Sequence, residues 1–108
     1  EVISAEAVQL LRSSPIWVVY DLEWTTWEGS LQRLWSGEGE ELEVVQIGAC
    51  KVDAKDGFKE IESFTTLVCP SLNPIVSDYF TQLTGTTQTA IDSSGTSFPI
   101  AFQKFQDF

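Results

Sequence analysis

The sequence predicts an α/β fold in which a sheet packs against flanking helices. Three segments, near residues 16–23, 44–52 and 58–68, have the apolar, β-branched and aromatic composition of strands. The segments before and after them place apolar residues at helical spacing instead. With 108 residues, 43% of them hydrophobic, the chain can bury one modest core. We therefore expect one unit in the order helix, three strands, helices.

A first helix is predicted from Ser4, and Pro15 ends it. Its apolar residues at helical spacing are Ile3, Ala7, Leu10 and Leu11. The run from Ile16 to Tyr20 follows at once and is apolar on both faces, which is typical of a strand with neighbours on either side and helices above and below. We expect this strand to be central in a mixed sheet.

Residues 24–43 form an insert between the first two strands. Four of its apolar residues fall at helical spacing: Trp27, Leu31, Leu34 and Trp35. Gly37 and Gly39 break the pattern, so we expect a loop or a partly helical segment. The short acidic run from Glu38 to Glu41 is typical of a solvated loop, and we assign it no function.

The second and third strands are predicted to form a hairpin around Asp56-Gly57. Positions whose numbers sum to about 111 then face each other, which places Cys50 opposite Ile61. In this register Cys50 and Cys69 lie about 26 Å apart, at a strand rise of about 3.3 Å. Bridged Cα atoms lie within roughly 7 Å, so we expect both cysteines to be reduced and buried.

Helices follow the hairpin. We expect one from Ser77 to a Gly85 cap, a short turn over Thr87 to Ile91, and a third helix from Ser97. The apolar face of the third helix is Phe98, Ala101, Phe102, Phe105 and Phe108. No glycine, asparagine or polar tail ends this helix, so we expect the domain to be truncated after it.

The charge balance is acidic. The formal net charge is −10, from 16 acidic and 6 basic residues, whereas a nucleic-acid binder normally carries a basic stripe. This argues against tight phosphate binding by these residues alone. No apolar run approaches the roughly 20 residues of a membrane helix, and Glu1 to Ser14 is too mixed for a signal peptide. We expect a cytoplasmic protein with no membrane partner.

The chain contains no histidine. This excludes Ser-His-Asp and Cys-His nucleophile systems, H-E-x-x-H zinc sites and mixed Cys/His zinc sites in these residues. Neither a G-x-x-x-x-G-K-[ST] phosphate loop nor a G-x-G-x-x-G turn is present. The chemistry that remains is that of carboxylates and metal ions.

Asp21 and Glu23 stand one residue apart at the end of the first strand. Side chains alternate along a strand, so the two carboxylates project from the same face while Leu22 points into the core. Adjacent carboxylates repel, and a hard divalent cation between them relieves the repulsion. The pattern therefore indicates a metal site. On spacing alone it is also compatible with a strand that simply exits into a polar loop.

Asp21-Leu22-Glu23 resembles the first motif of the DEDD (DnaQ-like) 3′→5′ exonucleases, in particular the Eri-1 and histone-mRNA exonuclease branch. Further stretches match in order over roughly residues 16–108. They are Val44 to Ala49 (E-I-I-E-I-G-A), Phe64 to Pro70 (F-x-x-x-V-x-P), Ser77 to Gln88 (S-D-F…L-T-G-I-T-Q) and Ile91-Asp92 (V-D). The chain departs from the family at Trp24, where a small residue is common, at Thr86, where Ile is usual, and in the insert of about twenty residues.

The resemblance implies a ribonuclease H-like fold, of which residues 1–108 would be the N-terminal part of one exonuclease domain. It implies hydrolysis of terminal phosphodiesters at the 3′ end of RNA or single-stranded DNA. Asp21 and Glu23 would be the catalytic and metal-binding acids for Mg²⁺ or Mn²⁺, with two ions in the complete domain. The general base and the other two acidic residues would lie downstream, so we expect the isolated residues 1–108 to be inactive.

Substrate contacts are implied at five positions: Leu22, Trp24, Thr25, Thr84 and Gly85. Trp24 follows the metal face and could shape the pocket of the terminal nucleotide. Trp27 and Trp35 could stack on unpaired bases, but packing over the sheet edge is favoured. The segment Leu83 to Gly85 is either a plain helix end or a turn that approaches the 3′ nucleotide, and both interpretations stay open.

A second hypothesis comes from a different class of protein. The chain could be a catalytically inactive, nuclease-like binding module whose acidic face holds a structural cation or docks a basic protein. The net charge of −10 favours this hypothesis, and the intact Asp21/Glu23 pair favours the enzyme.

Overall fold

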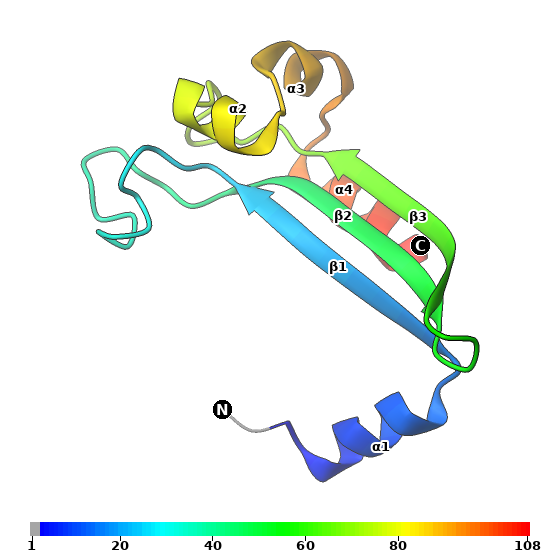
Figure 1. The fold of residues 1–108 in the computed structure, drawn as a ribbon. Coiled ribbons are helices and arrows are strands. Elements are labelled where there is room, and N and C mark those ends of the chain that lie inside the picture. The colour runs from blue at the N-terminus through cyan, green and yellow to red at the C-terminus, as the bar shows by residue number, and fades with distance from the viewer. Residues whose placement is uncertain (1–2) are drawn as a thin grey trace.

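A computed structural model describes residues 3–108 of the chain and confirms the α/β class. The elements are α1 (Ala5–Ser13), β1 (Ile16–Trp24), β2 (Val44–Asp53), β3 (Lys59–Leu67), α2 (Asp78–Thr84), α3 (Gln88–Ser94) and α4 (Phe98–Asp107). Figure 1 shows α4 against one face of the sheet, α2 and α3 beyond one end of the strands, and α1 at the other end. The predicted order of helix, three strands and helices is confirmed.

The sheet differs from the predicted one in strand order. All strand pairs of the described residues are antiparallel, in the order β1-β2-β3. β1 is therefore an edge strand here, and the prediction that it is central is wrong for this part of the chain. Its apolar side chains are correspondingly exposed, by 48% at Val18, 53% at Val19 and 59% at Tyr20. Outside the strands, a parallel bridge joins Val68 to Thr96.

The β2–β3 hairpin has a different register from the one predicted. Asp53 pairs with Lys59 across a turn of five residues, and the ladder has an irregularity after Lys51. Cys50 therefore faces Ser63 instead of Ile61. The five-residue turn and the irregularity after Lys51 each shift the pairing by one position. Both cysteines are free, as predicted, but Cys50 is only half-buried and Cys69 is exposed.

Two apolar clusters form the core. Val45, Phe80 and Ile91 pack together and join β2 to α2 and α3. Ile47, Val68 and Ala101 join the sheet to α4. Leu22 and Phe105 pack against the second cluster. Because side chains alternate along a strand, Asp21 and Glu23 project from the opposite face of β1, away from α4. We call that opposite face the acidic face.

The helices after the hairpin begin and end largely where the sequence predicts. Ser77 caps α2 by accepting a hydrogen bond from the backbone of Phe80, and Gly85 ends it in the left-handed conformation, with φ of 80°. Thr87 caps α3, which runs beyond the predicted turn to Ser94. α4 carries Pro99 in its first turn, where a missing N–H costs nothing.

The insert forms a loop of successive turns with no regular helix between Thr25 and Glu43. Leu34 and Trp35 both have positive φ, 53° and 55°, which no helix tolerates. Leu34 is 78% exposed, so the apolar spacing that suggested a helix does not mark one buried face. The alternative of a loop is the one confirmed.

Candidate functional site

The two predicted metal ligands lie near the end of β1. Asp21 pairs with Gly48 and Glu23 pairs with Gln46 on β2, so the four residues share the acidic face. Asp21 is exposed and Glu23 is half-buried. The strand ladder shifts register directly after Glu23, which turns the chain into the insert. β1 therefore presents both carboxylates at the point where the sheet ends.

The neighbours of the carboxylates leave room beside them. A Cβ atom built on Gly48 meets no atom within 4 Å, so the space next to Asp21 is open. Gln46, beside Glu23, receives a hydrogen bond of 3.2 Å from the hydroxyl of Thr86. This contact fastens the turn after α2 to the sheet next to the carboxylate pair. The acidic face thus combines two oxygen ligands with free volume.

This donor set fits part of the shell of a hard divalent cation. Carboxylate oxygens are the ligands that Mg²⁺ and Mn²⁺ take, and Mg²⁺ usually keeps several waters. Within residues 3–108, no group of three or more Asp, Glu, His or Cys side chains is assembled. Asp21 and Glu23 would therefore hold a metal ion as a pair, with the remaining ligands supplied by solvent, substrate or other residues.

A hollow of about 390 Å³ opens beside Glu23. We call it the aromatic hollow. Its lining residues are Glu23, Trp24, Thr26, Trp27, Leu31, Trp35, Tyr79 and Leu83. One wall comes from the insert, and α2 supplies the other through Tyr79 and Leu83. No lysine or arginine lines it, so the hollow is suited to a neutral planar group and not to a phosphate.

The predicted substrate-binding residues occupy different places. Trp24 lines the aromatic hollow and lies edge-on to Trp35, with ring centroids 6.4 Å apart. Leu22 packs in the core on the α4 side, so its side chain is not brought to the acidic face. Thr25 is buried, and its hydroxyl donates to the Glu41 carbonyl at 2.5 Å. The side chain of Thr25 is thus committed to the insert.

Thr84 and Gly85 lie in the turn that Thr86 fastens to Gln46. The Thr84 hydroxyl donates to the Phe80 carbonyl at 2.8 Å and accepts from the Thr86 backbone at 3.1 Å. The turn is thereby ordered next to the strand position opposite Glu23. This geometry is compatible with both interpretations that the sequence leaves open for the segment.

Most of the aromatic hollow is not predicted by the sequence pattern. Tyr79 and Leu83 fall within the motif that runs from Ser77 to Gln88, but that motif does not indicate a hollow. They stand four residues apart on one predicted helix, a spacing that places them on the same face. Trp27 and Trp35 are predicted to pack over the sheet edge, yet both are half-buried and line the hollow. Their shared location depends on the folding of the loop, which no periodic pattern encodes.

Glu43 secures the loop that borders the insert. Its carboxylate accepts hydrogen bonds from the backbone of Ser71, Leu72 and Asn73 at 2.8–3.1 Å, and from the Ser71 hydroxyl at 2.9 Å. Burial alone would raise the pKa of Glu43, but the hydrogen bonds from this loop outweigh it and lower the pKa. Asn73 in turn bonds to Gly39 and to the backbone of Glu41 in the insert.

We expect Glu43→Gln to lower the melting temperature at neutral pH. A hydrogen bond to a charged group contributes about 1.5–3 kcal/mol to the free energy of unfolding, and the neutral amide of Gln can replace only part of this. Because the folded pKa lies below the unfolded one, the contribution is present above the unfolded pKa and is lost as the pH falls through the folded value. The difference in melting temperature from the wild type should therefore shrink below the ordinary glutamate pKa of about 4.3. Glu41→Gln, an exposed neighbour, is the matched control; equal effects of the two variants would contradict the assignment.

The fold agrees with solved nuclease structures at low sequence identity. A full-length 3′-exonuclease matches with a TM-score of 0.73 and 24% identity, over 86% of this chain and 28% of that one. Cell-death related nuclease 4 (CRN-4) matches with a TM-score of 0.69 and 24% identity, over 86% and 29%. The nuclease domain of 3′hExo, a DEDDh family member bound to rAMP, gives 0.72 and 23%, over 88% and 44%. These likenesses confirm the ribonuclease H-like fold.

The chain spans less than half the length of each of these structures. No curated protein sequence matches it significantly. Among the described residues, none of the helices is both long and apolar enough to cross a membrane. The exonuclease family model (RNase_T) matches residues 18–108, which include both carboxylates, the insert and all three helices that follow the sheet. This chain therefore belongs to the exonuclease family.

Proposed function

We propose that the protein carrying this sequence is a metal-dependent 3′→5′ exonuclease that hydrolyses terminal phosphodiesters of RNA or single-stranded DNA. The observation that carries the proposal is the placement of Asp21 and Glu23 on one open face of β1, directly beside the aromatic hollow. Membership of the exonuclease family supports the reaction class. One structural neighbour is a DEDDh nuclease domain bound to rAMP, and this supports a nucleotide as the ligand class.

In this proposal Asp21 and Glu23 would hold Mg²⁺ or Mn²⁺, which would supply an activated water and stabilise charge on the phosphodiester oxygens. Asp21 and Glu23 contribute negative oxygen ligands from a strand, so their positions are set by the sheet. The open space at Gly48 leaves room beside them for a phosphodiester. The product is a nucleoside 5′-monophosphate.

The aromatic hollow holds the terminal nucleotide in this scheme. Trp24 and Leu83 come from the two walls and offer apolar surface to the faces of a base. Thr25 acts as a positioning residue, because its hydroxyl ties the end of β1 to the backbone of Glu41 and Glu43. The ordered turn at Thr84 and Gly85 borders the same region through Thr86 and Gln46.

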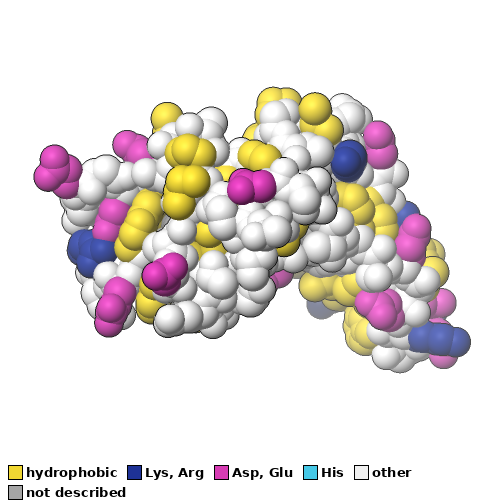
Figure 2. Space-filling model, turned by 90° about the horizontal axis from the view of Figure 1, so that it is seen from above, with side chains coloured by type: hydrophobic (Ala, Val, Ile, Leu, Met, Phe, Trp, Pro, Cys, Tyr) yellow, Lys and Arg dark blue, Asp and Glu magenta, His cyan; other side chains and the backbone are white. Residues whose placement is uncertain are grey.

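The acidic surface shapes the kind of binding that we expect. Basic side chains form no continuous patch on the face shown in Figure 2, where acidic side chains are scattered among hydrophobic ones. Affinity through phosphate neutralisation should therefore be small for these residues. Base stacking and the metal carry the interaction in this proposal. Because few lysine and arginine side chains neutralise phosphates, we expect a shallow dependence of binding on salt concentration.

The test uses the protein that carries this sequence, and not the isolated residues 1–108, with 5′-labelled single-stranded RNA and DNA and with Mg²⁺ or Mn²⁺. We expect a ladder of products shortened from the 3′ end, release of 5′-monophosphates, and loss of activity with EDTA. Cleavage from the 5′ end, or internal cleavage, would contradict the proposal. Binding of the oligonucleotides without any turnover, under conditions that activate other exonucleases, would instead support the inactive binding module.

Gly48 gives an independent check of the site. Gly48→Val should fold at least as stably as the wild type, because glycine inside a strand costs roughly 0.5–1 kcal/mol and the space for a side chain is free. The added methyl groups should fill the volume beside Asp21 and lower kcat/KM by about tenfold, equivalent to about 1.4 kcal/mol of transition-state stabilisation.

The control for Gly48→Val is Thr65→Val, which changes the strand neighbour of Gly48 on the same face without adding volume. Thermal melts and steady-state kinetics on both variants separate the effects. Full activity of Gly48→Val with unchanged stability would show that the reaction does not use this space.

A further inference from the structure

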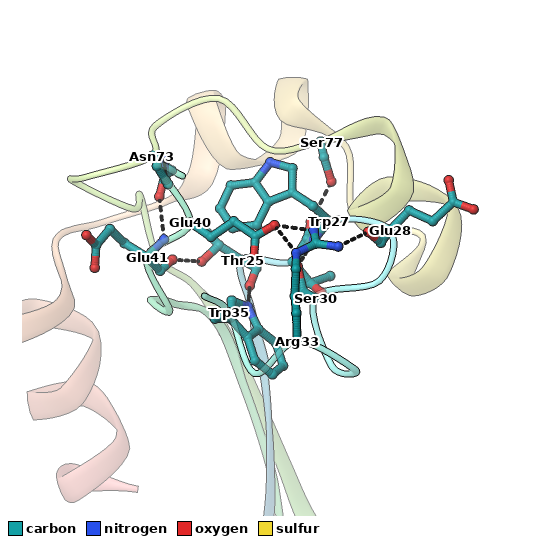
Figure 3. A network of polar contacts seen from close by, with 12 residues as sticks. Thr25, Trp27, Glu28, Ser30, Arg33, Trp35, Glu40, Glu41, Asn73 and Ser77 are labelled. Atoms are coloured by element: carbon teal, nitrogen blue, oxygen red, sulfur yellow. Dashed lines mark hydrogen bonds and ion pairs between the residues drawn. The ribbon is translucent and has the colours of Figure 1, made fainter. Parts of the chain in front are cut away.

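The insert is built around one buried serine. Ser30 is 1% exposed, and its hydroxyl accepts a hydrogen bond of 2.8 Å from the backbone of Trp27. The Ser30 carbonyl accepts another, of 2.9 Å, from the backbone of Trp35. The indole of Trp35 donates to the Thr25 carbonyl at 2.8 Å. Both tryptophans of the insert wall are therefore fixed relative to each other and to the end of β1 (Figure 3).

An ion pair closes the same loop. Arg33 donates to the Glu40 carboxylate from Nε, at 2.8 Å, and from Nη2. Its Nη1 donates to the Glu28 carbonyl at 2.9 Å, so one guanidinium joins the two ends of the turn (Figure 3). The side chain of Glu40 is only 8% exposed. The side chain of Arg33 is 38% exposed, so the pair is shielded on the Glu40 side only. Removing Arg33 would leave a shielded carboxylate without its partner, and this is the costly loss.

Two glycines make room for the ion pair. A Cβ atom on Gly29 would lie 2.6 Å from Nη1 of Arg33, and one on Gly37 would lie 2.6 Å from the Glu40 carboxylate. Gly29 also has a φ of 83°, which side chains disfavour. The close approach of both charged groups to the backbone thus depends on residues that lack a side chain.

The loop is also tied to the opposite wall of the aromatic hollow. The Asn73 side chain bonds to the Gly39 carbonyl at 2.9 Å and to the backbone of Glu41 at 3.2 Å. The Ser77 hydroxyl, at the start of α2, donates to the Thr26 carbonyl at 2.5 Å. These bonds set the distance between the insert wall and the wall carried by α2. The width of the hollow is thereby fixed by polar contacts outside it.

We propose that the Arg33–Glu40 pair is a clasp that positions the insert wall, so that the insert selects substrates whose terminal base is unpaired. This rests on the proposed exonuclease function. Neither residue lines the hollow, so the pair acts through Trp27, Leu31 and Trp35. A hollow of about 390 Å³ falls within the size range of small-ligand sites and has room for one nucleotide. A base that is paired to a second strand would have to leave its partner to enter the hollow. The ligand class is an unpaired 3′-terminal nucleotide, recognised by stacking on its base.

The test compares substrates that differ only in the terminal base. One oligonucleotide ends in an ordinary nucleotide and the other in an abasic residue, and Glu40→Gln and Arg33→Met are measured on both. With the ordinary terminus, we expect the variants to raise KM about tenfold with kcat changed less than about twofold. With the abasic terminus, which has nothing to stack, the variants should match the wild type. Glu62→Gln, which removes the exposed Lys51–Glu62 pair on the sheet, is the matched control.

Equal increases of KM on both oligonucleotides would show that the clasp only supports folding. No increase on either would show that the clasp does not position the insert wall. Both results would overturn the proposal. Equilibrium binding of the two oligonucleotides, measured with Ca²⁺ by tryptophan fluorescence, gives a readout that needs no turnover. If the exonuclease assay fails while the variants still bind the ordinary oligonucleotide more weakly than the wild type does, the proposed exonuclease function is refuted. The same result would support the role of the clasp.

Discussion

Asp21→Asn and Glu23→Gln should each abolish most exonuclease activity while the fold is retained. Each change keeps the shape of the side chain and removes a charge from the proposed metal pair. Metal ions contribute several kcal/mol to the stabilisation of the transition state. Losing part of this stabilisation should lower kcat/KM by about 10²–10³-fold. Steady-state hydrolysis of single-stranded substrate at ordinary Mg²⁺ concentration measures the effect.

The same substitutions should leave stability level or raise it. In the metal-free protein both changes relieve repulsion between adjacent carboxylates on one face. Thermal melts with EDTA check this, and Mn²⁺ titration calorimetry should show that Asp21→Ala loses binding. Asp56→Asn in the hairpin turn and Glu60→Gln on β3 are matched changes of exposed acids outside the site. Near-native turnover in Asp21→Asn or Glu23→Gln would remove the metal role from this pair.

Phe80→Ala should give the largest loss of stability. Phe80 is fully buried and packs with Val45 and Ile91, which join α2 and α3 to β2. Truncating a buried phenylalanine costs about 3–5 kcal/mol, a large part of the roughly 5–15 kcal/mol that stabilises a typical domain. α2 carries Tyr79 and Leu83, so partial melting of this helix should also remove one wall of the aromatic hollow.

Phe98→Ala is the control for Phe80→Ala, because it removes the same number of atoms from a side chain that is 45% exposed. Denaturant unfolding of the two variants should separate them by more than about 2 kcal/mol, which is well above the typical effect of a surface substitution. Similar midpoints for both would show that the cluster around Phe80 does not hold α2 in place.

The local elements could be predicted from the sequence because their signals are local. Ser4, Ser77 and Gly85 mark helix ends through capping chemistry that involves only neighbouring residues, and the structure confirms all three. The shared face of Asp21 and Glu23 follows from the two-residue period of a strand, so it required no knowledge of the fold. The order of the motifs along the chain was likewise sufficient to recognise the exonuclease family.

Register and loop structure could not be predicted in the same way. The hairpin shifts by two positions at Cys50, because the five-residue connection moves the pairing by one position and the irregularity after Lys51 moves it by another. Both features depend on how the two strands pack. The insert repeats apolar residues at helical spacing, yet Ser30, Arg33 and Glu40 hold it as a loop. Those contacts join residues 3–7 positions apart in a geometry that no period describes.

Periodicity, local capping and motif order were enough to establish the α/β class, the cap residues, the carboxylate pair and the family. The neighbours of that pair depend instead on how the whole chain folds. Strand pairing places Gly48 beside Asp21, and packing gathers Trp27, Trp35, Tyr79 and Leu83 around one hollow next to Glu23. These residues lie up to 56 positions apart along the chain, from Trp27 to Leu83, so their proximity is set by long-range packing and hydrogen bonds and not by any local pattern.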